Sequence, residues 1–103
     1  MKVIQDLCDY IDEEINDAIK YAKFAISLKD EYPVIADAIS KISDEEMKHM
    51  SMLHSCVMSV IEDYRKKNGE PPAHMQMLYD ILHKKQIQHA AEAKAYQSMY
   101  KGT

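Results

Sequence analysis

Only two short stretches of this chain interrupt a helical pattern, and they constrain its fold more than any other feature. One is Lys29–Pro33 (KDEYP) and the other is Asn68–Pro72 (NGEPP). Glycine commonly follows the end of a helix, and proline commonly begins one. With 2 glycines and 3 prolines in 103 residues, the chain is too poor in turn residues for many short strands. We therefore predict three long helices, over residues 3–29, 34–66 and 72–101.

Each segment carries apolar residues at the spacing of one helix face. In the first segment they are Ile4, Leu7, Ile11, Ile15, Ala18, Ala22 and Ala25. In the second they are Ile35, Ile39, Ile42, Leu53, Cys56, Val60 and Tyr64. In the third they are Leu78, Ile81, Leu82, Ala93, Tyr96 and Met99. Short connections make consecutive helices antiparallel, so we expect an all-α hairpin followed by a third long helix.

The expected shape is long for a chain of this size. Helices of on the order of 40–50 Å would leave a single chain of three helices with a narrow core. We expect one domain over residues 1–103, whose four-helix-type bundle is completed by oligomerisation.

Composition and charge exclude several classes of function. The net charge is −4 without a basic cluster, so we expect no nucleic acid partner. No apolar run exceeds three residues, so we expect no membrane partner. The first residues lack the apolar core of a secretory signal. Cys8 and Cys56 do not form a CxxC pair, so we expect buried, reduced thiols and a cytoplasmic protein.

Several ionisable residues fall within the apolar stripes. They are Glu14 in the first helix, Glu46 and His49 in the second, and Lys85, His89 and Glu92 in the third. Burying a lone carboxylate costs several kcal/mol or more, so these groups should meet one another.

Counting from the turns places these groups at one level. Glu14 and His49 lie equally far from the first turn, so they are level in an antiparallel pair. By the same count across the second turn, His49 faces His89 and Glu46 faces Glu92. A layer of carboxylates and imidazoles at one level inside a helical bundle is typical of a carboxylate-bridged dinuclear metal site. Its oxygen-rich ligands favour iron or manganese over a structural thiolate zinc site.

Other interpretations remain open at this point. A lone Glu-x-x-His occurs on many helices that bind no metal. His89 and Glu92 can pair with each other or with Lys85 instead of serving as ligands. The chain can then be a metal-free helical oligomerisation module. A further alternative is a Zn²⁺ or Mn²⁺ site that sets assembly without redox turnover.

The residues around these ligands resemble those of a known superfamily. Glu14 and the segment Asp44–His49 (DEEMKH) resemble the ferritin-like di-iron carboxylate proteins. Tyr21 and Phe24 follow Glu14 as in the first helix of rubrerythrins, and Glu-x-x-His resembles that of rubrerythrins and bacterioferritins. The resemblance covers residues 10–55.

The resemblance implies a di-iron cofactor, with Mn or Zn as alternatives. Glu14, Glu46 and His49 would be metal ligands, and Tyr21 would be a redox-active tyrosine or one beside the ligands. The implied function is a ferroxidase that oxidises Fe²⁺ with O₂ or peroxide in iron handling or protection from oxidative stress. A rubrerythrin-like peroxide reductase with an external electron donor is the alternative.

The chain departs from the superfamily in its third helix. A second Glu-x-x-His is absent, and the third segment reads His89-x-x-Glu92, the reverse order. Encapsulated ferritins, which the chain also resembles, complete a half-site by pairing two chains. This likeness implies a homo-oligomer, a dimer or larger. Met47 matches the position of the haem-binding methionine of bacterioferritins, but nothing else favours haem, so we do not expect it.

Overall fold

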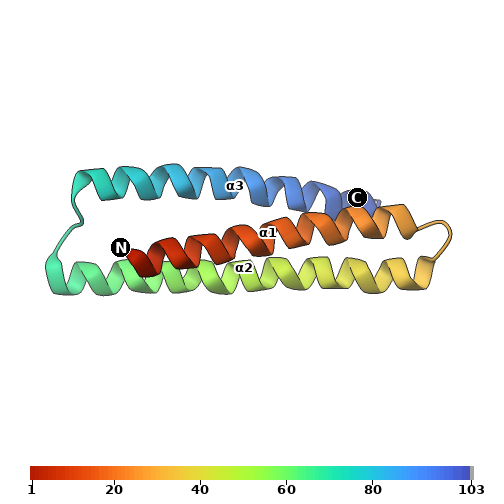
Figure 1. Cartoon of the computed structure of the whole chain (residues 1–103), viewed down its shortest axis with the longest axis horizontal. Helices are drawn as coiled ribbons and strands as arrows, with labels where there is room; N and C mark the ends of the chain where they lie inside the picture. The colour runs from red at the N-terminus through yellow and green to blue at the C-terminus, as the bar shows by residue number, and fades with distance from the viewer. Residues whose placement is uncertain (103) are drawn as a thin grey trace.

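The computed structural model describes residues 1–102 as three α-helices joined by short connections (Figure 1). These are α1 (Lys2–Leu28), α2 (Pro33–Asn68) and α3 (Ala73–Lys101). The described residues contain no strand. The prediction of an all-α chain with three long helices is therefore confirmed, and the helix ends differ from those expected by at most two residues. Between residues 1 and 102, no helix has the combination of length and hydropathy that crossing a bilayer requires.

The connections end and restart the helices as the sequence predicts. The Tyr32 N–H donates to the Leu28 carbonyl at 2.8 Å, and Pro33 opens α2. After α2, Gly69 has a φ of 77°, a conformation that favours glycine, and its N–H donates to the Arg65 carbonyl at 3.0 Å. Both turns are tight, so α1 is antiparallel to α2 and α2 to α3.

The molecule is elongated, with extents of 56 × 20 × 18 Å. Its radius of gyration is 16.6 Å, compared with about 13 Å for a compact domain of this length. In Figure 1, α1 lies between α2 and α3. A chain of this shape has a narrow core and leaves much of its apolar surface uncovered.

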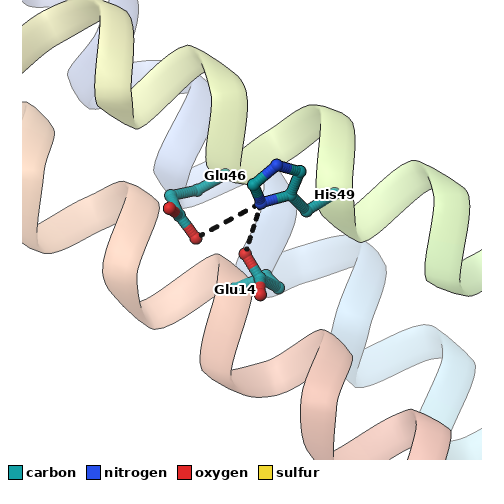
Figure 2. A group of neighbouring side chains, drawn as sticks. All are labelled: Glu14, Glu46 and His49. Atoms are coloured by element: carbon teal, nitrogen blue, oxygen red, sulfur yellow. Dashed lines mark hydrogen bonds and ion pairs between the residues drawn. The ribbon is translucent and has the colours of Figure 1, made fainter.

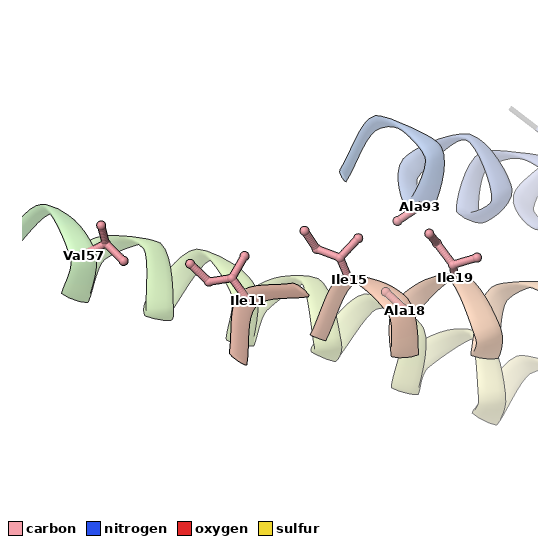
Figure 3. Packing of buried hydrophobic residues seen from close by; sticks show 6 residues of the cluster. All are labelled: Ile11, Ile15, Ala18, Ile19, Val57 and Ala93. Atoms are coloured by element: carbon pink, nitrogen blue, oxygen red, sulfur yellow. The ribbon is translucent and has the colours of Figure 1, made fainter. Parts of the chain in front are cut away.

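The main core lies where α1 meets both of its neighbours (Figure 3). It comprises Ile11, Ile15, Ala18, Ile19, Val57 and Ala93. Ile15 and Ala18 have no exposed surface, and Ile11 is 1% exposed. The predicted inward face of the first helix is therefore confirmed for its central residues.

The buried face of α2 differs from the predicted one. Ala36, Ser40, Ser43 and Val57 are buried, whereas Ile35 is 52% exposed and Ile42 is 36% exposed. The prediction that both isoleucines face the core is wrong for this chain. Small residues let the backbones of α1 and α2 approach closely, and the Ser43 hydroxyl donates to the Ala18 carbonyl at 2.6 Å.

The packing of α3 also differs from the predicted stripe. Its buried residues are Gln86, Ala93, Gln97 and Tyr100. Its exposed apolar residues include Leu78, Ile81 and Met99, which we expected to face the core. Gln97 Nε2 donates to the Ser43 carbonyl at 3.1 Å and to its hydroxyl at 3.0 Å. Of the predicted stripe, Ala93 is buried in the main core and Tyr96 packs against it, and polar contacts with α2 add to this apolar packing.

The two cysteines lie in different environments. Cys8 is buried, and burial raises the pKa of its thiol. Cys56 is exposed, so the prediction of a buried thiol is wrong for this residue. Both are free cysteines. The Gln86 side chain of α3 partly opposes this rise in the pKa of Cys8, while Cys56 lies on an outer side of α2.

Candidate metal centre

One group of metal-ligating side chains stands out among the described residues. Glu14 comes from α1, and Glu46 and His49 come from α2. One ligand atom from each residue lies within 4.8 Å of the others. His49 Nδ1 is 3.3 Å from Glu14 Oε2 and 3.9 Å from Glu46 Oε2 (Figure 2). The structure therefore brings together Glu14 and His49, which the count from the first turn placed at one level, and Glu46, which shares a helix face with His49.

Local helix geometry positions each of the three side chains. Glu46 and His49 are three residues apart, so they share one face of α2. Glu14 projects from α1 toward that face. About one turn away, the 2.6 Å hydrogen bond between Ser43 and Ala18 holds the two backbones close. This close contact keeps the three side chains within reach of one ion.

The group lies at the side of the bundle and opens to solvent on one face. The side chain of Glu46 is 18% exposed, that of Glu14 is 24% exposed and that of His49 is 53% exposed. The carboxylates are therefore partly removed from water, while the imidazole lies at the solvent edge. An ion could enter without any helix moving.

Negative charge in the group is incompletely compensated. The pKa of Glu46 is raised to about 7, first because its carboxyl hydrogen-bonds with that of Glu14, then because of burial and the charge of Glu14. The charge of His49 lowers the pKa of Glu46. Within residues 1–102, neither carboxylate forms an ion pair with a lysine or arginine. The raised pKa of Glu46 reflects the repulsion between the two carboxylates, which a divalent cation could relieve.

The three ligands can coordinate a metal ion but cannot fill its coordination sphere. Two carboxylates and one imidazole suit iron, manganese or zinc. Dinuclear carboxylate sites in helical bundles use a Glu from each of two helices and a Glu-x-x-His from each of two others. This chain supplies one such Glu and one Glu-x-x-His pair, which is half of the ligands of a dinuclear site.

The structure does not bring His89 or Glu92 into this group. Glu92 is exposed, and His89 is half-buried and interacts electrostatically with Asp12 of α1. Burial raises the pKa of Asp12, and the imidazole of His89 opposes that rise. His89 therefore interacts with α1 and Glu92 with solvent, and neither joins the ligands of α2.

Two further residues named from the sequence lie close to the group along their helices. Tyr21 is half-buried on α1, seven residues beyond Glu14. Met47 is partly buried against the main core. Met47 therefore contributes to packing inside the chain.

Sequence reasoning missed a second group of ring side chains. His54 of α2 and His83 of α3 stack on each other with ring centroids 5.1 Å apart. Both residues lie about equally far from the second turn, so the same counting of levels could have found the pair.

Residues 1–102 define a three-helix all-α fold that carries the carboxylate–imidazole group of Glu14, Glu46 and His49. No protein-family model, curated protein or solved structure matches the chain.

Proposed function

We propose that this protein binds iron through Glu14, Glu46 and His49, and that a second copy of the chain completes a di-iron site. We further propose that the site is a ferroxidase centre, where Fe²⁺ is oxidised by oxygen or peroxide. The observation that carries the proposal is the Glu–Glu–His group, whose ligand atoms lie within 4.8 Å of one another at an open face.

The number of ligands supports a site shared by two chains. Two copies would supply four carboxylates and two imidazoles, the set that dinuclear sites in helical bundles use. The observed residues fit iron because the donors are mainly oxygen, and because no lysine or arginine within residues 1–102 pairs with the two carboxylates.

Exposed apolar side chains beside the group support a partner at the same face. Tyr10 is 56% exposed, Ile35 is 52% exposed and Ile42 is 36% exposed. At 100° per residue, each lies within about 40° of Glu14 or Glu46 around its helix. A second copy that covered the open face would remove these side chains from water and would bring its own ligands to the site.

The residues of the chain would have separate roles. Bound iron would supply the electrons: two Fe²⁺ ions lose one electron each, and hydrogen peroxide takes up both electrons and two protons to give two water molecules. Glu14 and Glu46 would offset the charge of the ions. His49 would bind at the solvent edge, and the partial burial of the carboxylates would limit the access of water.

Iron binding to the purified protein tests the proposal. We expect about one Fe²⁺ per chain under anaerobic conditions, and faster oxidation than in buffer after O₂ or H₂O₂ is added. Glu46→Ala and His49→Ala should lose both properties. The matched control is His74→Ala, because His74 is an exposed histidine on α3.

Three outcomes would decide between the interpretations. Fewer than about one iron per two chains, with an unchanged Glu46→Ala variant, would overturn the proposal and leave a metal-free helical module. Sustained peroxide turnover with an external electron donor would identify a peroxide reductase. Metal-dependent assembly without oxygen consumption would identify a site that only sets assembly.

A further inference from the structure

A ladder of three rings links α2 to the first half of α3. The His54 and His83 rings stack at 5.1 Å between centroids, with 25° between their planes. Tyr79 stacks on His83 at 5.6 Å and 12°, and its hydroxyl donates to Met58 Sδ at 3.7 Å. These contacts join the two helices far from the Gln97–Ser43 contact at the other end of α3.

Each imidazole has one ring nitrogen that is sealed from solvent. His54 Nε2 and His83 Nδ1 are buried and have no hydrogen-bond partner within the described part of the chain. A neutral imidazole can leave one nitrogen bare, but a protonated imidazole carries an N–H on both nitrogens. A second proton would therefore create a buried donor that lacks an acceptor, which is unfavourable.

The groups packed around the pair offer little to neutralise a new positive charge. The adjoining cavity is lined mainly by apolar residues such as Ile87 and Ala90, its polar residues include Ser51, Ser55 and Gln86, and its one charged residue is the cation Lys94. The residues one turn from His54 on α2 are uncharged.

The titratable groups of the other packed elements lie outside this cavity. On α1 they include Cys8, whose pKa the Gln86 side chain influences, and Asp12, which interacts with His89. On α3, Asp80 precedes His83 by about one turn, is exposed and accepts a 2.9 Å hydrogen bond from Gln76.

We propose that His54 and His83 form a pH-sensitive latch that holds the first half of α3 on the bundle. When both rings are neutral they stack. Proton uptake by either ring places a charge against the partner ring and creates a sealed N–H that lacks an acceptor. Residues 73–86 then move away from α2.

The second half of α3 has its own anchors, so the latch acts on one half alone. Tyr100 donates to Asp37 Oδ1 at 2.9 Å, and Lys101 pairs with Asp44 Oδ1 at 2.9 Å. The latch is also separate from the candidate metal centre, because His54 lies about 140° around α2 from His49.

Opening of the latch would uncover an apolar cavity at that end of the molecule. This cavity, of about 90 Å³, is lined by residues that include Ile4, Ile61, Tyr79 and Leu82. Acidification would therefore expose apolar side chains from all three helices without disturbing the ligands.

Amide hydrogen exchange of the metal-free protein tests the latch at about pH 7.5 and about pH 5, with correction for the intrinsic effect of pH. We expect exchange in residues 73–86 to become about tenfold faster at the lower pH, and exchange in residues 87–101 to change less than about twofold. Phenylalanine keeps an aromatic ring but cannot be protonated. Because either imidazole can open the latch, the double variant His54→Phe/His83→Phe should remove most of the acceleration, and each single variant should remove part of it. His74→Phe, on the exposed side of α3, is the control and should keep it.

Unchanged exchange in the wild-type segment would overturn the proposal, as would an acceleration that survives in the double variant. If a phenylalanine variant has less helical structure at pH 7.5, the wild-type protein still tests the proposal. The NMR titration of the two imidazoles and the acceleration of exchange must then share one midpoint, and separate midpoints would refute the latch.

Discussion

Replacing Glu46 with glutamine should change how the stability of the metal-free protein depends on pH. The pKa of Glu46 is about 7 in the folded chain and 4.5 for the ordinary side chain. Between these values the folded state holds a proton that the unfolded state has released, so stability falls as pH rises through this window. Below this pH window the ionisation of Glu46 does not lower the stability of the folded state. Above the window it lowers that stability to the full extent.

The structure bounds the size of this effect. The full difference in pKa corresponds to about 3 kcal/mol at most. Glu46 keeps 18% of its side chain exposed, so solvent screens part of the interaction, and we expect about 1–2 kcal/mol. A glutamine fits the same space and can donate to Glu14, but it does not titrate.

Urea denaturation at about pH 5 and about pH 8 in the presence of a chelator measures the effect. The loss of unfolding free energy between these pH values should be about 1–2 kcal/mol smaller in Glu46→Gln than in the wild-type protein. Glu45→Gln is the matched control because Glu45 is the exposed neighbour of Glu46, and it should behave as the wild type does. Equal pH profiles for wild type and Glu46→Gln would refute the raised pKa of Glu46.

Three further predictions follow from the packing. Ser43→Ala removes a buried hydrogen bond to the Ala18 carbonyl, so it should lower the free energy of unfolding by about 1–2 kcal/mol. A denaturation midpoint equal to that of the wild type would contradict this prediction. Ile15→Ala empties a site with no exposed surface and should cost about 2–4 kcal/mol in the same assay, and a cost below about 1 kcal/mol would show that the core collapses around it. Iodoacetamide should modify exposed Cys56 at least about tenfold faster than buried Cys8, and similar rates in the folded protein would contradict the burial of Cys8.

The sequence predicted the candidate site better than it predicted the outer faces of the helices. Glu14 and His49 met as expected because an antiparallel hairpin with a tight turn fixes which residues are level. His89 and Glu92 did not join them, since level alone does not fix the rotation of α3 about its axis. That rotation is set by contacts such as Gln97 with Ser43, and neither residue gives a hydrophobic signal.

The sequence by itself determined the local features of this protein. Scarce glycine and proline set three helices and their ends, and the spacing of Glu46 and His49 set a shared helix face. Tertiary structure alone decided which faces are buried. The small residues Ser43 and Ala18 allow a close approach of α1 and α2, so Ile35 and Ile42 remain exposed although they are more hydrophobic. The physical reason is that local periodicity depends on neighbours along the chain, whereas burial depends on how closely two helices can pack.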